Sequence, residues 1–152
     1  MTDLDTEVSG HFSPKVFPSA QDLVKAMGFQ DIMKGATIDA KIFTPCGFSL
    51  NALFENEVYF TIHVTPQIEC SFASFETNLP KESYSTLISD VVAIFKPGKC
   101  TVTVYASKNA DYKPEQPDDY LPGFSCCERH LCSLPTYSLH FSSYKQEIDC
   151  LE

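Results

Sequence analysis

Apolar residues alternate with polar ones along two neighbouring stretches of the chain, residues 48–54 and 58–64. Period-two alternation is typical of β-strands that bury one face. The polar triplet Glu55-Asn56-Glu57 separates the two stretches and suits a three-residue hairpin loop. The sequence therefore predicts a β-hairpin whose apolar face is formed by Phe48, Leu50, Ala52, Phe54, Val58, Phe60, Ile62 and Val64.

The loop also predicts the register of this hairpin. When Asn56 is its centre, every apolar residue of one strand faces an apolar residue of the other. The same register sets Ser49 opposite His63 on the polar face, with Cβ atoms roughly 4.5–5.5 Å apart. A slip of one residue would turn one apolar set to the wrong face, whereas a slip of two would keep the faces and separate Ser49 from His63.

Composition limits the class of protein. A chain of 152 residues with 43% apolar residues is long enough for one packed domain or for part of a larger one. A net charge of −9 argues against binding to nucleic acid, which requires basic patches. The sequence has no apolar run long enough to cross a membrane and begins without the basic and apolar regions of a signal peptide. We therefore expect a cytoplasmic protein that binds neither nucleic acid nor membrane.

Seven cysteines in such a chain are expected to be free thiols. The segment CCERHLC, with Cys126, Cys127, His130 and Cys132, suggests a zinc site. However, the adjacent Cys126 and Cys127 would point to opposite faces of a strand, and the spacing is not one of the usual zinc-ligand spacings. We expect no metal site.

Hydrophobic periodicity and turn residues divide the rest of the chain. We expect a loose segment over residues 1–17, a folded region over 18–145 and an acidic tail over 146–152. Within the folded region, the predicted helices are 19–27 and 82–95, and the predicted strands, besides the hairpin, are 36–43, 70–76, 100–106, 124–131 and 137–144. The polar, proline-rich stretch 108–122 is predicted to be a loop. This order predicts an α+β fold with a mainly antiparallel sheet and helices on one face.

A serine beside a histidine can support nucleophilic catalysis with the histidine as base. Here no nucleophile-elbow motif surrounds Ser49, and no carboxylate is placed to orient His63. From the residues alone, structural polar side chains and a catalytic pair both remain open, and an unrelated Ser-His hydrolase is the weakest alternative.

Four runs of sequence resemble the C-terminal half of eukaryotic S-adenosylmethionine decarboxylases. They are I-D-A-x-x-F-x-P-C-G-F-S at 38–49, T-I-H-V-T-P at 61–66, S-F-A-S-F-E-T-N at 71–78 and F-K-P-G-K at 95–99. The resemblance implies one half of a four-layer αββα sandwich. It also implies a decarboxylase whose covalently bound pyruvoyl group, made from a serine by self-cleavage of a proenzyme, serves as electron sink during loss of carbon dioxide. The product would serve spermidine and spermine synthesis.

The resemblance also implies roles for individual residues. Ser49 and His63 match the serine and the histidine that assist self-processing, and Phe43 matches the aromatic residue that stacks on the substrate adenine. Gln67 stands where the family has a glutamate that binds the ribose hydroxyls. Glu76 matches an acid of the network through which putrescine activates some members. Implied partners are S-adenosylmethionine, putrescine as activator and the N-terminal half. A homodimer is compatible with this interpretation, and the sequence does not fix the oligomeric state.

Two departures from the family pattern give a second hypothesis. Gln67 lacks the charge of the glutamate, and the Glu-Ser-Ser run that holds the self-cleaved serine is absent, since the one Glu-Ser pair is Glu82-Ser83. We therefore expect the chain alone to lack the cofactor and activity. The alternative is a non-catalytic regulatory or interaction subunit related to the decarboxylase.

Overall fold

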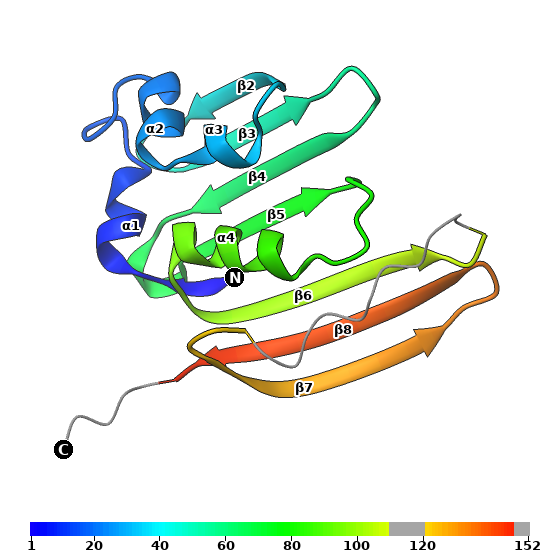
Figure 1. Cartoon of the computed structure of the whole chain (residues 1–152). Helices are drawn as coiled ribbons and strands as arrows, with labels where there is room; N and C mark the ends of the chain where they lie inside the picture. Colours follow the sequence, from blue (N-terminus) through cyan, green and yellow to red (C-terminus); the bar gives the residue numbers. More distant parts are fainter. Residues whose placement is uncertain (110–120, 148–152) are drawn as a thin grey trace.

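The computed structural model describes residues 1–109 and 121–147, which form an eight-stranded antiparallel sheet in the order β2-β3-β4-β5-β1-β6-β8-β7 (Figure 1). The strands are β1 (Thr2–Leu4), β2 (Thr37–Ile42), β3 (Phe48–Leu53), β4 (Tyr59–Thr65), β5 (Phe72–Thr77), β6 (Pro97–Ser107), β7 (Phe124–Ser133) and β8 (Tyr137–Gln146). The helices are α1 (Thr6–His11), α2 (Ala20–Ala26), α3 (Phe29–Ile32) and α4 (Ser85–Phe95), with a 3-10 turn η1 (Ile68–Cys70). This arrangement confirms the predicted α+β class.

The predicted hairpin is formed by β3 and β4 in the predicted register. Phe48 pairs with Val64, Leu50 with Ile62, and Ala52 with Phe60. The loop closes where the Phe54 amide donates to the Val58 carbonyl at 2.9 Å. The alternation of apolar residues excludes a slip of one residue, and the three-residue loop selects this register over a slip of two.

All four described helices cover one face of the sheet, and four phenylalanine rings join them to it (Figure 1). Phe12 follows α1, Phe29 begins α3, Phe48 begins β3 and Phe95 ends α4. Ring centroids are 5.6 Å apart for Phe12–Phe48, 5.9 Å for Phe29–Phe48 and 5.8 Å for Phe29–Phe95. We call these four residues the phenylalanine cluster; each is at most 1% exposed.

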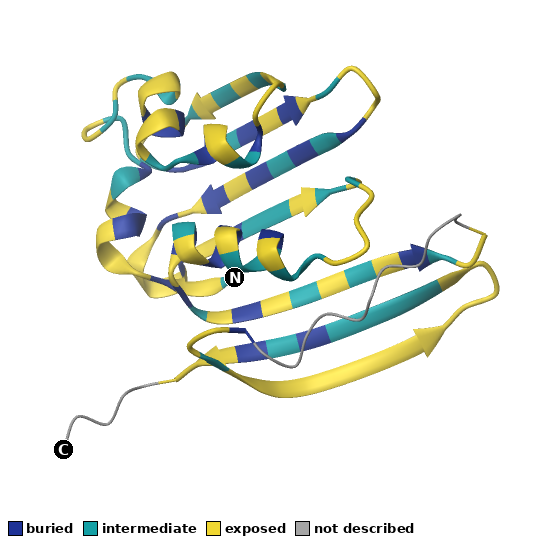
Figure 2. Cartoon of the chain, viewed as in Figure 1, coloured by how far each residue is buried: buried dark blue, intermediate teal, exposed yellow. Residues whose placement is uncertain are grey.

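The opposite face of the sheet carries no helix among the described residues, and we call it the open face. Burial alternates along β3 and β4, so residues that point away from the phenylalanine cluster are exposed or half-buried (Figure 2). Strand β7, at the edge of the sheet, is exposed along almost its whole length. None of the described helices is long and apolar enough to cross a membrane.

The prediction of a loose segment over residues 1–17 is wrong. Thr2–Leu4 forms β1 in the middle of the sheet, paired with β5 and β6, and Thr6–His11 forms α1. Asp5 caps α1 by accepting hydrogen bonds from the Glu7 and Val8 amides at 3.0 and 3.1 Å. Leu4 of β1, Val8 of α1 and Phe12, which caps the C-terminal end of α1, are buried in the core.

The other predicted elements agree with the structure to within a few residues. Ser19 caps α2 through its Oγ, which accepts from the Asp22 amide, and α4 ends where Lys96 takes a left-handed conformation before Pro97. Most of the predicted loop, residues 110–120, and the end of the predicted acidic tail, residues 148–152, lie outside the described residues.

The amino group of Met1 lies within the sheet, where it donates a hydrogen bond to the Ala73 carbonyl at 3.0 Å. Burial lowers the pKa of this amine below its ordinary value of 8.0. A lowered pKa means that the native state binds fewer protons than the unfolded state. The free energy of unfolding is therefore reduced below the lowered pKa and rises with pH up to about 8.0.

We predict that Nα-acetylation removes this pH dependence while keeping an amide donor for Ala73. Urea unfolding between about pH 6 and pH 8 would show the free-amine chain gaining stability relative to the acetylated chain. Burial raises the pKa of Cys100 above its ordinary value of 9.0. The Cys100 thiol therefore ionises above the tested pH range and does not contribute to the pH dependence measured there. Parallel stability curves for the two forms would contradict the prediction.

Candidate functional site

Ser49 and His63 lie directly opposite each other on β3 and β4, as predicted. The residues before and after each of them are buried on the helix-covered side, so both side chains lie on the open face. Ser49 is half-buried and His63 is exposed. Within the part of the chain that the structure describes, neither side chain forms a hydrogen bond. A hydroxyl and an imidazole are therefore available side by side to a common reactant.

The flanking strands extend this pair into a row of four residues. Lys41 on β2 pairs with Ser49, and Ser74 on β5 pairs with His63. The row Lys41–Ser49–His63–Ser74 presents an ammonium, two hydroxyls and an imidazole across four adjacent strands. We call it the processing row, after the role that the sequence resemblance implies for Ser49 and His63. Sequence reasoning missed Lys41 and Ser74 because their positions depend on the strand order around the hairpin.

A second row runs parallel to the first and contains Glu76. Asp39, Asn51, Thr61 and Glu76 pair in succession across β2, β3, β4 and β5. Thr61 Oγ1 donates to Asn51 Oδ1 at 3.1 Å. The Tyr59 hydroxyl donates to Glu76 Oε1 at 2.6 Å, and this hydrogen bond raises the pKa of Tyr59. We call this set the acidic row because it places a carboxylate at each end.

Phe43 and Gln67 lie at the same end of the sheet as the processing row. Strands β2 and β4 both run antiparallel to β3, so their C-terminal ends lie at the same end of the sheet. Phe43 directly follows β2, and Gln67 follows β4 at the start of η1. The Phe43 ring is 42% exposed, with Lys41 Nζ 5.3 Å from its centroid.

Gly47 contacts Phe43 at this end of the sheet. A Cβ on Gly47 would make ordinary contacts, 3.7 Å from the Phe43 Cβ and 3.5 Å from the Val64 carbonyl oxygen, but the Gly47 φ of 119° disfavours other residues. Gly47 lies two residues before Ser49, and Val64 directly follows His63, so Phe43 lies at the same end of the sheet as these two residues. An aromatic face, an amide and the processing row thus share one end of the open face.

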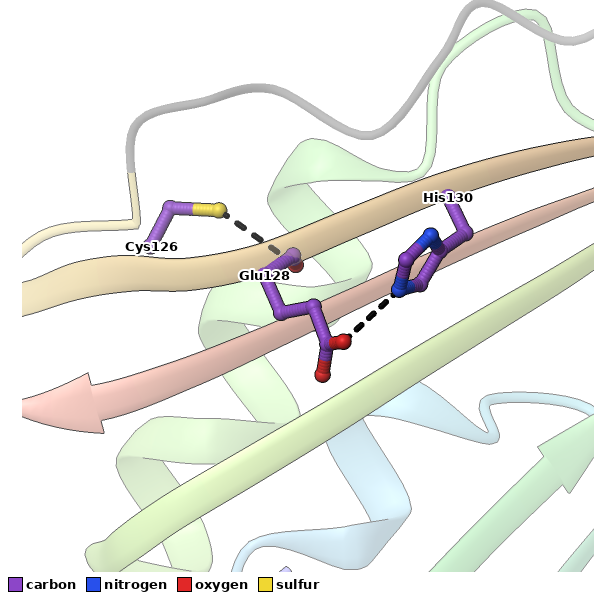
Figure 3. Close-up of polar contacts among 3 residues, drawn as sticks. All are labelled: Cys126, Glu128 and His130. Carbon is purple, nitrogen blue, oxygen red and sulfur yellow. Dashed lines mark hydrogen bonds and ion pairs between the residues drawn. The ribbon is translucent and has the colours of Figure 1, made fainter.

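The CCERHLC segment lies elsewhere, on the edge strand β7 (Figure 3). A bulge between Cys126 and Glu128 interrupts the pairing with β8. His130 Nε2 and Glu128 Oε1 form an exposed pair at 2.7 Å, and Cys126 Sγ donates to the Glu128 carbonyl at 3.7 Å. Among the described residues, no group of three or more histidines, cysteines or acids could hold a metal ion.

The chain is similar to known proteins in both sequence and structure. The family model described as adenosylmethionine decarboxylase matches residues 1–145. S-adenosylmethionine decarboxylase proenzymes of Xenopus laevis and Drosophila melanogaster are 34% and 35% identical to the chain, each over 95% of its length. The crystal structure of the Trypanosoma brucei AdoMetDC-delta26 monomer superimposes with a TM-score of 0.87 at 25% identity, over 97% of this chain.

The matches also show how much of the relatives the chain represents. It spans 43% of both the Xenopus and Drosophila proenzymes and 63% of the trypanosomal chain. The family match nevertheless covers nearly all of the chain, from the first residue of β1 through most of β8. The chain belongs to the adenosylmethionine decarboxylase family.

Proposed function

We propose that this chain supplies the C-terminal part of an S-adenosylmethionine decarboxylase. One observation carries the proposal: the register that sets the Ser49 hydroxyl beside the His63 imidazole on the open face, where neither group is hydrogen-bonded to any of the described residues. The family match supports the reaction class, since the named relatives are decarboxylase proenzymes. Decarboxylation would occur once a complementary part supplies the self-cleaved serine.

In this proposal Ser49 and His63 act in self-processing of the proenzyme. Processing begins when the complementary serine attacks its preceding carbonyl and gives an ester. Ser49 holds the intermediate by hydrogen bonding, and His63 accepts the proton from the serine α-carbon so that the chain breaks by elimination. Imidazole suits this step because it exchanges protons near neutral pH.

The pyruvoyl group that results would supply a ketone that accepts electrons during loss of carbon dioxide. The open face fits such a group, because Ser49 and His63 offer free polar atoms there and the bulky apolar residues of β3 and β4 point to the other side. Both residues would contact the group and keep its surroundings polar.

Phe43 and Gln67 are proposed to bind the substrate. The half-exposed Phe43 ring can stack on an adenine face, and the Gln67 amide can hydrogen-bond to ribose hydroxyls. A neutral amide makes weaker hydrogen bonds than the glutamate of the family pattern. We therefore assign Phe43 the larger share of adenosine binding.

Glu76 is proposed to respond to putrescine through the acidic row. An ammonium group of a diamine requires a carboxylate partner, and Glu76 offers one on the open face at one end of this row. The hydrogen bond from Tyr59 fixes the Glu76 carboxylate. Diamine binding there would act on the processing row, which is the next row of the same face.

The second candidate is a non-catalytic subunit that regulates a complete decarboxylase. Gln67 favours it, since the exchange of an acid for an amide weakens ribose binding. Retention of Ser49 opposite His63 favours the catalytic role, because a regulatory subunit has no use for processing residues.

We predict that the purified 152-residue chain contains no pyruvoyl group and releases no carbon dioxide from S-adenosylmethionine. The only Glu-Ser pair is the exposed Glu82-Ser83, which lies before α4 and away from the processing row. Intact-mass spectrometry would show the uncleaved chain, and labelled carbon dioxide would stay at background. Turnover by this chain alone would overturn the assignment.

We predict that His63→Ala, in a full-length proenzyme carrying this segment, slows self-processing by at least about 100-fold, because loss of a general base typically costs this much. Uncleaved proenzyme or its ester should accumulate, and hydroxylamine should split the ester into two chains. Ser49→Ala should slow cleavage less.

His130→Ala is the matched control, since His130 is an exposed histidine on β7, away from the processing row. Band splitting on a denaturing gel follows the rates. Cleavage of His63→Ala at the parent rate would exclude His63 as the processing base.

We predict that Phe43→Ala, in the same processed enzyme, raises KM for S-adenosylmethionine roughly 5- to 150-fold, because loss of base stacking costs about 1–3 kcal/mol. Self-processing should proceed normally. Phe43→Tyr keeps the ring and should keep KM. Equal KM values for the alanine and tyrosine variants would show that Phe43 serves packing alone.

A further inference from the structure

The side chain of Lys41 connects two parts of the candidate site on the open face. On β2, Lys41 is exposed, whereas its neighbours Ala40 and Ile42 are half-buried against the core on the helix-covered side. Across the sheet, Lys41 pairs with Ser49, so the two Cβ atoms lie roughly 4.5–5.5 Å apart. Its Nζ lies 5.3 Å from the centroid of the Phe43 ring. The Lys41 side chain therefore begins beside the processing row and ends at the ring that is proposed to stack on adenine.

The Lys41 ammonium forms no ion pair with any residue that the structure describes. Asp39 lies two residues earlier on the same face of β2, and no ion pair joins it to Lys41. Gln67, at the same end of the sheet, is neutral where the family pattern has a glutamate. Because no described carboxylate neutralises the ammonium, its positive charge acts on a ligand that lies along the lysine side chain.

The substrate and the product of the proposed reaction differ in charge. S-adenosylmethionine carries a sulfonium, an ammonium and a carboxylate, and loss of carbon dioxide replaces the carboxylate by a proton. The product therefore has one more unit of net positive charge than the substrate. A ligand with its adenine on Phe43 and its reacting carbon at Ser49 and His63 extends along Lys41. The carboxylate is bonded to the reacting carbon, so it lies within reach of the flexible lysine stem, which begins beside Ser49.

We propose that Lys41 determines specificity for the substrate over the product: its ammonium pairs with the carboxylate of bound S-adenosylmethionine and repels the product, which has lost that carboxylate. This inference rests on the proposed function for the identity of the two ligands. Specificity is a difference of affinities, and one fixed charge changes both affinities in opposite directions. Repulsion of the product would also promote its release.

Lys41→Met tests this role, because methionine keeps a long unbranched side chain and removes the charge. In a processed full-length enzyme that carries this segment, KM for S-adenosylmethionine should rise at least about threefold. The Kd of the decarboxylated product, measured by calorimetry, should fall by a similar factor. Methylthioadenosine lacks the sulfonium, the ammonium and the carboxylate, so its Kd should not change. Shifts of substrate and product in the same direction, or no shift in either, would overturn the proposal.

Two control variants separate the charge of Lys41 from packing and from the net charge of the protein. Lys41→Arg keeps the positive charge and should keep the parent values for both ligands. Lys25→Met removes an exposed lysine of α2, on the helix-covered side, and should also leave both values unchanged. Added salt should move the parent values toward those of Lys41→Met, since screening weakens an exposed charge. An arginine variant that behaves like the methionine variant would exclude charge as the cause.

The outcome for Lys41 can be separated from the outcome for the proposed function. If the enzyme releases no carbon dioxide, the decarboxylase assignment fails, and the calorimetric Kd of S-adenosylmethionine takes the place of KM. Opposite shifts of the two Kd values in Lys41→Met would then still support the role of Lys41. Carbon dioxide release without opposite shifts leaves the function in place and removes the role of Lys41. Absence of binding by all three ligands would overturn both.

Discussion

The position of every residue in the candidate site depends on the burial of Phe48 in the phenylalanine cluster. Phe48 contacts both Phe12 and Phe29, so one side chain of β3 is held against α1 and α3 at once. Full burial of a phenylalanine contributes about 1.5–3 kcal/mol. Because side chains alternate along a strand, fixing Phe48 inward fixes Ser49 outward, and pairing with β4 then sets His63 beside it. The reactive face is thus a consequence of core packing.

The hairpin and the Ser49–His63 pair could be predicted from sequence because both depend only on neighbouring residues, those of the two strands and the loop between them. Alternation on both strands and a short loop leave one register that buries every apolar residue. Lys41 and Ser74 could not be placed in this way. Their positions require the order β2-β3-β4-β5, which arises from pairings between segments that the hairpin pattern does not link. Tyr59 was missed for the same reason, since its partner Glu76 lies on another strand.

The N-terminal segment shows a different limit of sequence reasoning. A three-residue strand carries too little pattern to be recognised, and β1 is held by its two neighbours rather than by its own propensity. Leu4 is the one buried residue of β1, and a single apolar position gives no periodicity. Yet β1 joins the β2–β5 part of the sheet to β6, β8 and β7. The least predictable strand therefore holds the two parts of the sheet together.

The polar groups of the open face limit which segments can cover it. The open face offers hydroxyls, carboxylates, an ammonium and an imidazole, each of which needs its own polar partner when water is removed. A segment that covers this face must therefore be polar where it meets Ser49 and His63, since each group left without a partner would cost free energy.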